Sequence, residues 1–189
     1  MGSGRRQADE GRRTRDMALL PIRLYGDPVL RRKSAPVAVV DDKIRRLAAD
    51  MVETMFENNG VGLAAPQVGL SLRLLVADAT HRDGGDGPRV FINPEILDAW
   101  DEWSFDEGCL SLPGLSAELV RPEGILLRYQ DETGTECEEE FHQLWSRVLQ
   151  HEIDHLDGRL FVDRMSPMRR ALIERKLREL VKESKDVSL

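Results

Sequence analysis

The chain has 189 residues, of which 41% are hydrophobic and 32% are charged, and its formal net charge is −7 at pH 7. This length suits one domain with a sizeable core, and the composition is ordinary for a globular protein. The negative charge argues against a general binder of DNA or RNA, although a local basic patch is compatible with it. No apolar run approaches the ~20 residues that a helix needs to cross a membrane, so we expect no membrane association.

The segment 1–16 mixes arginines with acidic residues and lacks aliphatic periodicity. Such a segment cannot bury enough surface to offset the entropy of ordering it, so we expect a disordered tail followed by one domain over residues 17–189. The tail has no apolar stretch of the kind that a secretory signal needs. Cys109 and Cys137 are too few for a secreted disulfide framework, and we therefore expect a cytoplasmic protein whose cysteines are free thiols or metal ligands.

A first helix is predicted after Asp41 and Asp42, which can cap it. Apolar residues follow at helical spacing as far as Phe56, and the residues Asn-Asn-Gly at 58–60 end the helix because they tolerate a left-handed backbone. The glycine-rich segment 60–69 is predicted to be a loop. Strands are predicted at residues 72–77, 89–92, 125–129 and 135–141, separated by turn residues.

A second helix is predicted over residues 141–156, and a third over residues 168–183, where Ser166 and Pro167 form the cap and first turn. One helix, several strands and then two helices make an α+β order, because the strict alternation of a parallel sheet is missing. The apolar spacing of the second helix continues into His151 and His155, so both histidines face the core. The apolar residues of that row are Phe141, Leu144, Trp145, Val148 and Leu149.

The segment 151–155, with the sequence HEIDH, is the strongest candidate for a chemical site. Residues four apart on a helix share one face with Cβ atoms about 5–6 Å apart, so two imidazoles can bind one metal ion. Glu152 lies beside the pair, where it could activate a metal-bound water without being a ligand. Two buried histidines in a charged stretch are the structural alternative. Burial favours the metal site, because buried ionisable groups need partners.

A catalytic metal site of this type needs three protein ligands and one open position. Glu174 has a suitable separation, but the spacing of Arg170, Glu174 and Arg178 favours an ion pair on an exposed helix face. Cys137 lies in an acidic strand and is expected to be a bystander. Cys109 is the best candidate, because a small residue precedes it and turn residues follow it. Taken by itself, however, Cys109 is better interpreted as a buried free thiol.

Three segments resemble the signature motifs of bacterial peptide deformylases that carry a C-terminal helix, and they occur in the same order. The segments are residues 60–67 (GVGLAAPQ), 107–111 (EGCLS) and 151–158 (HEIDHLDG), and the similarity runs from about residue 20 to about residue 180, including DPVLR at 27–31. The resemblance implies an α+β fold in which mixed or antiparallel strands pack around a central metal-binding helix, with a helix at the C-terminus. It makes residues 17–189 one catalytic domain.

The resemblance also implies a metal and an activity. Cys109, His151 and His155 would bind one Fe²⁺ per chain, and Ni²⁺, Co²⁺ or Zn²⁺ can take its place. The activity would be hydrolysis of the N-formyl group from the formyl-methionine of nascent polypeptides, with release of formate. A hydroxide on the metal would attack the formyl carbon, and Glu152 would act as general base and then as general acid.

The same resemblance assigns residues to the oxyanion and to the substrate. The side-chain amide of Gln67 and the backbone N–H of Leu110 would hold the oxyanion. Gly62 would let the loop backbone pair with the substrate, because a side chain there would intrude. The pocket for the methionine side chain would be lined by Val61, Phe105, Leu144 and Val148. Turn formation by Gly62 and ordinary core packing by the four lining residues are the structural alternatives.

Two charged residues and three departures complete the comparison with the family pattern. Glu107 and Arg121 match an ion pair behind the cysteine, and without the resemblance we would interpret both as surface charges. Gln143 and Ser146 stand where the family has Gly and Ala, and Trp145 is bulkier than usual. We expect these three residues to change the packing behind the helix and the shape of the pocket, without touching the ligands.

The last predicted helix is rich in basic residues. The resemblance implies that such a helix can dock on the ribosome near the tunnel exit, and a basic face suits ribosomal RNA. A solvated helix face is an equally good interpretation. The basic residues are Arg169, Arg170, Arg175, Lys176, Arg178, Lys182 and Lys185, and the acidic ones are Glu174, Glu179 and Glu183.

Two other functions compete with a deformylase. A zincin-type peptidase would use the same histidines and Glu152 but would need a carboxylate or histidine as its third ligand, and His81 and His142 are poorly placed for that role. A non-catalytic binding protein with a deformylase-like fold would be expected to have lost Glu152, Gln67 or a ligand. All of these residues are present.

Overall fold

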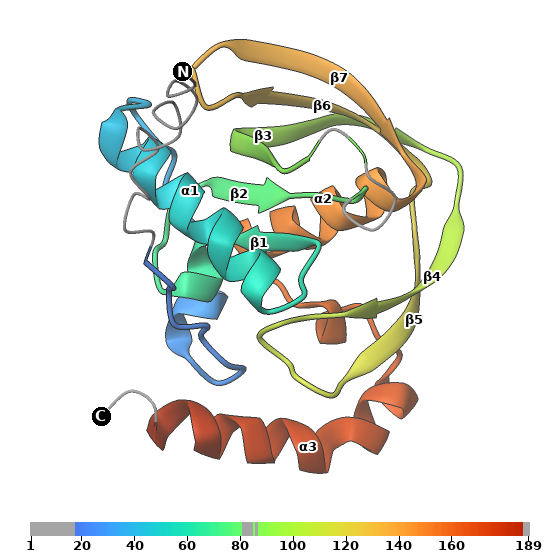
Figure 1. Ribbon diagram of the computed structural model, residues 1–189. Helices are drawn as coiled ribbons and strands as arrows, with labels where there is room; N and C mark the ends of the chain where they lie inside the picture. The colour runs from blue at the N-terminus through green and yellow to red at the C-terminus, as the bar shows by residue number, and fades with distance from the viewer. Residues whose placement is uncertain (1–17, 81–84, 86, 187–189) are drawn as a thin grey trace, which may run out of the picture.

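The computed structural model describes residues 18–80, 85 and 87–186 (Figure 1). The predicted tail at 1–16 and His81 therefore lie outside the described residues, and the division into tail and domain stays a prediction. The helices of the described part are α1 (Asp42–Glu57), α2 (Gln143–Leu156) and α3 (Pro167–Asp186), with short 3-10 turns η1 (Pro28–Arg31), η2 (Ala65–Val68) and η3 (Phe161–Asp163). The strands are β1 (Gly62–Ala64), β2 (Leu74–Ala77), β3 (Arg89–Trp100), β4 (Trp103–Gly108), β5 (Ser116–Arg121), β6 (Gly124–Gln130) and β7 (Glu136–His142).

The first helix, α1, confirms the sequence prediction at both ends. The Asp41 side chain accepts hydrogen bonds from the backbone N–H groups of Lys43 and Ile44, each at 3.0 Å, and so satisfies donors that the helix itself leaves free. After Glu57 the chain turns through Asn59, whose φ of 55° is left-handed. The buried residues Ala48, Met51 and Met55 then pack with Leu63, Leu74 and Val76 in one apolar cluster.

A five-stranded sheet in the order β1-β2-β3-β6-β7 forms the body of the molecule, and all of its strand pairs are antiparallel. β4 and β5 form a separate antiparallel hairpin, which curves down one side of the molecule from the sheet towards α3 (Figure 1). The predicted strands at 72–77, 125–129 and 135–141 are confirmed as β2, β6 and β7, and the α+β class is confirmed with them.

The sequence prediction missed parts of this strand structure. β3 continues to Trp100, beyond the predicted end at residue 92, and its register shifts on either side of Ile96. Pro94 within the strand explains the early stop of the prediction, because proline removes a ladder hydrogen bond and is tolerated at irregularities. β1 and η2 occupy the predicted loop at 60–69. β4 and β5 were not predicted, since β4 buries Glu107 and leaves its neighbours largely exposed.

The second helix, α2, lies in the middle of the molecule beneath the concave side of the sheet (Figure 1). It begins at Gln143, so the predicted start at residue 141 is wrong: Phe141 belongs to β7 and pairs with Ile125 of β6. From Ser146 to Leu156 every residue of α2 is buried, including charged ones. The predicted apolar face is therefore one side of a helix that is covered all round.

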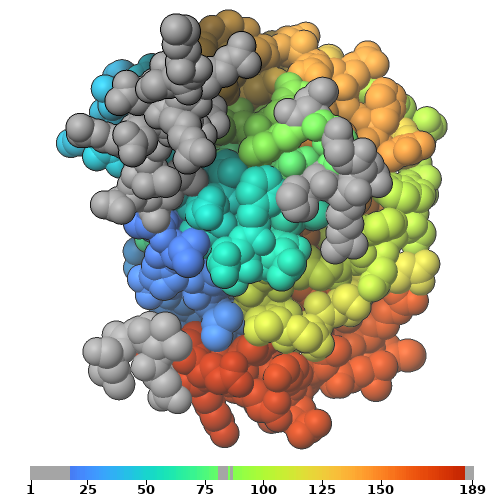
Figure 2. All heavy atoms as spheres, in the orientation of Figure 1, coloured from blue at the N-terminus to red at the C-terminus, as the bar shows by residue number. Residues whose placement is uncertain are grey.

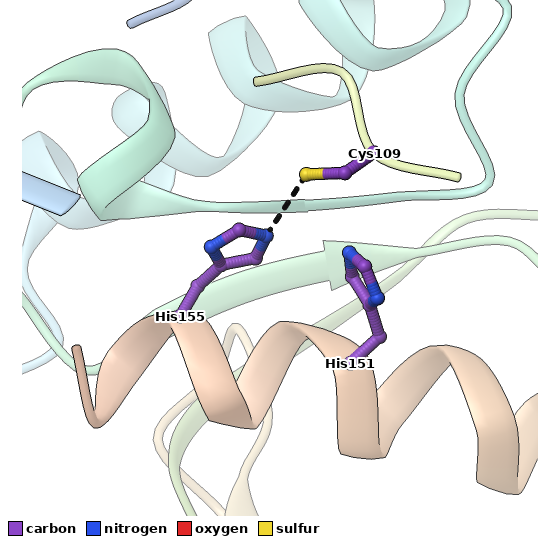
Figure 3. A group of neighbouring side chains, drawn as sticks. All are labelled: Cys109, His151 and His155. Carbon is purple, nitrogen blue, oxygen red and sulfur yellow. Dashed lines mark hydrogen bonds between the residues drawn. The ribbon is translucent and has the colours of Figure 1, made fainter. Parts of the chain in front are cut away.

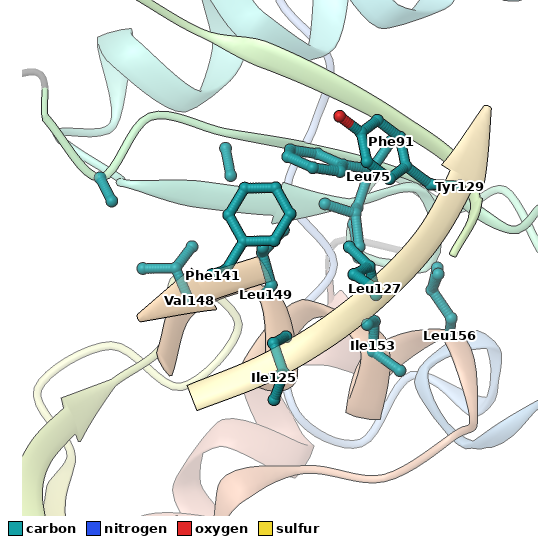
Figure 4. Close-up of a cluster of buried hydrophobic side chains, with 13 residues drawn as sticks. Leu75, Phe91, Ile125, Leu127, Tyr129, Phe141, Val148, Leu149, Ile153 and Leu156 are labelled. Carbon is teal, nitrogen blue, oxygen red and sulfur yellow. The ribbon is translucent and has the colours of Figure 1, made fainter. Parts of the chain in front are cut away.

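One side of α2 packs against the sheet in an apolar cluster (Figure 4). Val148, Leu149 and Ile153 point from the helix towards residues of β6 and β7, with aromatic rings above them. This packing fixes the height and rotation of α2, because buried side chains fit together at the density of a crystal. The cluster comprises Ala64, Leu75, Ala77, Ala79, Phe91, Ile125, Leu127, Tyr129, Phe141, Val148, Leu149, Ile153 and Leu156.

The third helix, α3, covers one end of the molecule, as the space-filling view shows in red (Figure 2). It begins at Pro167, as predicted, and packs through Leu177 and Leu180 into a cluster that also contains Leu112 and Phe161. The turn at Gly26 approaches α3 so closely that a Cβ there would lie 2.8 Å from the Cα of Val181. No helix among the described residues combines the length and the apolar character needed to span a bilayer.

Candidate active site

The three predicted metal ligands converge from two elements. His151 and His155 rise from α2, and Cys109 lies in the turn after β4, facing them (Figure 3). Their ligand atoms all lie within 4.8 Å of one another, and the Sγ of Cys109 is 3.3 Å from the Nε2 of His155. The site is therefore a group of one sulfur and two imidazoles, which suits a transition metal better than Mg²⁺ or Ca²⁺.

The protonation of the two histidines differs because their surroundings differ. Burial, together with the charges of His151 and Arg121, lowers the pKa of His155 well below its usual value. Burial would also lower the pKa of His151, but hydrogen bonds to Cys109 and Glu107 raise it well above the usual value. A bound cation would take the place of that proton, since a metal binds the neutral ring.

Glu152 lies beside the ligand group and is buried to 4% exposure. Its Oε2 is buried without a hydrogen-bond partner among the described residues. Burial raises the pKa of Glu152 to about 7, with nearby carboxylates adding to the effect and His151 opposing it. A carboxylate with such a pKa can accept and return a proton near neutral pH.

Gln67 reaches the same site from η2 with a fixed orientation. Its Oε1 accepts the backbone N–H of Ala64 at 2.8 Å. The Nε2 is therefore turned towards the Sγ of Cys109 at 3.6 Å and the hydroxyl of Ser111 at 3.3 Å. Leu110 follows Cys109 directly in the turn. Both predicted oxyanion donors belong to residues that line the same cavity.

A pocket of about 650 Å³ opens in front of the ligand group. Its lining contains the four residues predicted for a methionine side chain, namely Val61, Phe105, Leu144 and Val148, together with Gly62, Gln67, Cys109, Leu110, His151 and Glu152. Phe105 stands at the rim with 39% exposure, whereas Val148 is buried. His155 is not among the lining residues and lies deeper, so the pocket gives access to one side of the ligand group.

The position of Gly62 explains why that residue has no side chain. A Cβ there would lie 2.6 Å from Oε1 of Glu152 and 2.8 Å from Cγ1 of Val148. Real Cβ atoms essentially never approach other atoms so closely. The backbone of β1 is thus free to come within contact distance of both the carboxylate and the pocket wall.

Comparison with known proteins gives a family for this arrangement. The family profile described as "Polypeptide deformylase" matches residues 19–171. The chain is 51% identical over 161 residues to a peptide deformylase of Chlorobaculum parvum, covering 84% of this chain and 86% of the relative. It is 50% identical over 169 residues to that of Alkalilimnicola ehrlichii, covering 89% and 94%. The chain belongs to the peptide deformylase family.

A solved structure agrees with this assignment. The crystal structure of peptide deformylase from Thermus thermophilus is similar with a TM-score of 0.81 and 48% identity, covering 87% of this chain and 99% of that one. The expected deformylase fold is thereby confirmed, and with it an enzyme of the hydrolase class. Membership of this family rules out the zincin-type peptidase, and the presence of Glu152, Gln67 and the ligand group argues against a non-catalytic binding protein with this fold.

Behind the three ligand residues lies a buried carboxylate, that of Glu107, which contacts two arginines and one of the histidines. Glu107 accepts from Arg121 at 2.5 and 2.8 Å, from Arg147 at 2.8 Å, and lies 3.0 Å from Nδ1 of His151. Burial alone would raise the pKa of Glu107, but the hydrogen bonds from His151 and Arg121 hold it well below the usual value. An ionised Glu107 keeps the proton of His151 on Nδ1, which leaves Nε2 for the metal.

Sequence reasoning missed three members of this network, namely Asp154, Arg147 and Arg164. Arg121 also bonds Asp154 at 2.7 Å, and Arg147 bonds Glu107 from one turn before His151. Arg147 falls four residues before His151, on the same helix face, and that spacing was the available signal. Asp154 belongs to the HEIDH motif but lies on a different side of the helix from His151 and His155, so its spacing in the sequence did not indicate a partner. Arg164, after η3, completes the network with two hydrogen bonds to Asp154 at 2.7 Å.

The three departures from the family pattern lie at the start of α2. Gln143 has a left-handed backbone with a φ of 50°, where glycine is the least strained residue. Ser146 donates to the carbonyl of Pro122 at 3.3 Å and accepts from Gln150 at 2.9 Å. Trp145 packs with Phe91 and Phe141 on the sheet side. None of the three is among the described residues that line the pocket.

The residues that the sequence analysis rejected as metal ligands lie away from Cys109, His151 and His155. Cys137 is on β7, within hydrogen-bonding distance of the carbonyl of Thr135, at 3.6 Å. His142, at the N-terminus of α2, lies 3.3 Å from Glu123. Glu174 is exposed on α3, as predicted, but no ion pair joins it to Arg170 or Arg178 among the described residues, and Arg170 bonds Asp163 at 3.1 Å instead.

Proposed function

We propose that this deformylase removes the formyl group from the formyl-methionine of nascent polypeptides with Cys109, His151 and His155 as the ligands of one metal ion. The observation that carries the proposal is the convergence of the three ligand atoms within 4.8 Å beside a buried, unpartnered oxygen of Glu152. A buried carboxylate oxygen without a partner costs free energy, which is recovered when a water or substrate atom binds to it.

The donor set supports a transition metal, and we propose Fe²⁺. One thiolate and two imidazoles also suit Ni²⁺, Co²⁺ and Zn²⁺, so these ions should be able to replace iron. When bound, such an ion supplies an acidified water that can act as a nucleophile near neutral pH. Glu107 and Arg121 serve this centre by fixing the orientation of His151, whose Nδ1 lies 3.0 Å from Oε2 of Glu107.

Glu152 is proposed as the general base and general acid. With a pKa raised to about 7 by burial, it can take the proton of the attacking water on its free oxygen. The C–N bond of the formamide then breaks, and the same carboxyl returns the proton to the departing amine. Formate and a peptide with a free amino terminus are the products, so one water is consumed and no redox partner is needed.

The negative charge that develops on the formyl oxygen is proposed to be held by Gln67 and by the backbone N–H of Leu110. The hydrogen bond from Ala64 N–H to Oε1 leaves the Nε2 of Gln67 as the end that faces the site. A fixed donor of this kind can stabilise the transition state by about 3–4 kcal/mol. It needs no reorganisation at the moment of reaction, because its side chain is already held in place.

The methionine side chain is proposed to occupy the apolar part of the pocket. Val61, Leu144 and Val148 form its inner wall and Phe105 its rim, while Gly62 leaves the β1 backbone open to the substrate backbone. A flexible thioether fits such a cavity, since methionine adapts to irregular apolar spaces. Substrates whose first side chain is short would leave this wall uncovered.

The cellular location of the enzyme is inferred from its substrate. Formylated nascent chains emerge from ribosomes in the bacterial cytoplasm, so we place the enzyme there. We also propose that the exposed basic residues of α3, such as Arg175 and Arg178, contact ribosomal RNA. Binding to ribosomes that weakens steeply with salt would support this contact, and binding that ignores salt would contradict it.

One experiment tests the chemistry. The protein is purified without oxygen, its metal is measured, and formate release from a formyl-Met tripeptide is compared with that of Glu152→Ala. The variant should keep its metal and lose about 10²–10⁴-fold in rate, the usual worth of general acid–base catalysis. No formate from the iron-loaded wild type would overturn the proposal. A Cys109→Ser variant that still bound metal normally would overturn the ligand assignment.

A further inference from the structure

Arg147 is a charged residue of α2 that the proposed chemistry does not use. It is buried to 2% exposure, lies one turn before His151 and lines the pocket. Burying a guanidinium is costly unless its donors find acceptors; both Nη atoms of Arg147 find them, while its Nε has no hydrogen-bond partner among the described residues. Its partners therefore show what the residue is positioned to hold.

The guanidinium of Arg147 joins three residues of two strands, β4 and β5, to α2. Its Nη1 donates to Oε1 of Glu107 at 2.8 Å and to the carbonyl of Leu119, on β5, at 3.2 Å. Its Nη2 donates to the carbonyl of Trp103 at the start of β4. The ring of Trp103 also covers the guanidinium, with 5.4 Å from Cζ to the ring centroid. Both strands of the β4–β5 hairpin are thus attached to the helix that carries the histidines.

Neutralising Glu107 does not require Arg147. Arg121 already bonds both oxygens of that carboxylate, at 2.5 and 2.8 Å. What Arg147 adds is the connection from the carboxylate to the two backbone carbonyls of the hairpin. A planar guanidinium can make these contacts at once because its donors are arranged as a rigid fork.

Two branches lead from Arg147 into the site. The first passes through Glu107 to Nδ1 of His151, 3.0 Å away, and so orients a metal ligand. The second passes through Trp103 to Phe105, whose ring centroid lies 4.8 Å from that of Trp103 and which forms the rim of the pocket. One side chain therefore supports both the metal side and the substrate side of the cavity.

We propose that Arg147 is a positioning residue that holds the β4 wall of the methionine pocket in register with the metal-binding helix. This inference rests on the proposed roles of His151 and Phe105. Arg147 itself touches neither the metal nor the reacting atoms. Its removal should therefore weaken metal binding and methionine selectivity together, without abolishing the reaction.

The test compares Arg147→Met, Arg147→Lys and, as a matched control, Arg89→Met. Arg89 is also an arginine that bonds a carboxylate, Glu139, at 2.6 Å and packs on aromatic rings, but it lies on β3 outside the pocket lining. Two quantities are measured on each folded protein. The first is Co²⁺ affinity from the thiolate absorption bands, and the second is the ratio of kcat/KM for a formyl-Met tripeptide to that for a formyl-Ala tripeptide.

Arg147→Met should bind Co²⁺ about tenfold more weakly, as is usual when a partner behind a metal ligand is lost. Its selectivity for formyl-Met should fall by roughly fivefold, because the pocket wall is no longer held against the side chain. Arg147→Lys should keep most of the Co²⁺ affinity, since an ammonium can still reach Glu107. It should not recover selectivity, because one nitrogen cannot also hold both carbonyls. The loss in the lysine variant should be in KM, with kcat near wild type.

Wild-type values of both quantities in Arg147→Met would overturn the inference, as would equal losses in Arg89→Met. If the methionine variant does not fold, the lysine variant decides alone. In Arg147→Lys, retained Co²⁺ affinity together with lost selectivity for formyl-Met supports both branches, and any other combination of the two results overturns the inference. A wild-type enzyme that releases no formate would instead overturn the proposed function, so the two failures are distinguishable.

Discussion

Helices α2 and α3 are close in the chain but are stabilised in opposite ways. In α2, every residue from Ser146 to Leu156 is buried, and the charged side chains of Arg147 and Asp154 bond to groups on β4 and β5 and to Arg164 after η3. In α3, Leu177 and Leu180 are buried, while Met168 and Leu172 are 79% and 81% exposed. The shorter helix is enclosed by the protein, and the longer one lies along its surface (Figure 1).

A polar helix face can thus be either solvated or buried against charged partners. The charges of α3 are mostly solvated, and such a face contributes little to stability. The charges of α2 look similar in sequence, but a second layer, the β4–β5 hairpin, covers them and supplies partners. Buried charges of this kind hold groups in one geometry, and removing one of them leaves another uncompensated. We expect the same substitution to have very different effects on the two helices.

The largest effect on stability is expected when the layer over α2 loses its central carboxylate. Glu107→Gln leaves Arg121 and Arg147 buried against a neutral amide, which should lower the free energy of unfolding by about 3–5 kcal/mol. Glu179→Gln, on the exposed face of α3, removes ion pairs with Arg175 and Lys176 and should change it by less than about 0.5 kcal/mol. Urea denaturation followed by circular dichroism measures both. Similar losses in the two variants would remove the distinction between the helices.

The next effect concerns the apolar contact by which α3 is attached. Leu180 is fully buried, so Leu180→Ala should lower the free energy of unfolding by about 3 kcal/mol. Leu172→Ala, on the exposed side of the same helix, should be close to neutral by the rule for exposed positions, within about 0.5 kcal/mol. If both variants were equally stable in urea, α3 would not be packed on the body in solution.

A smaller effect of opposite sign is expected at the start of α2. Gln143 adopts a φ of 50°, which is strained for any residue with a Cβ. Gln143→Gly should therefore be more stable than Gln143→Ala by about 1 kcal/mol, because both variants lose the side chain and the glycine alone relieves the strain. Thermal unfolding of the pair measures the difference. An alanine variant at least as stable as the glycine one would show that the strained backbone is absent in solution.

The sequence contained enough to predict the ligand face of α2 and too little to predict what covers its other face. Helical spacing placed His151 and His155 together, and the motif containing Cys109 was needed to bring a third ligand to them. The β4–β5 hairpin was missed because Glu107 is the buried residue of β4, and β5 buries Arg121 beside Ala117 and Leu119 while the apolar Val120 is exposed. A pattern of apolar residues cannot reveal a strand whose buried side chain is charged. Arg147 and Asp154 were missed for the same reason, since their partners belong to that hairpin, apart from Arg164, which also bonds Asp154.

The smallest effect is expected in the pH dependence of the contact between η3 and the start of α3. Burial would raise the pKa of Asp163, but hydrogen bonds from Arg31 and from the backbone of Leu160 lower it, and Arg170 of α3 adds to this. Because the folded pKa is depressed, the carboxylate contributes stability above its unfolded pKa of about 3.9, and the contribution is lost as pH falls through the folded value. Asp163→Asn removes the charge at every pH, so its deficit against wild type in urea should be present at pH 7 and should shrink as pH falls below about 4. A deficit independent of pH would mean that Asp163 acts through its hydrogen bonds alone. In that case the attachment of α3 would be as insensitive to charge as its exposed face, and α2 would be the helix whose position depends on ion pairs.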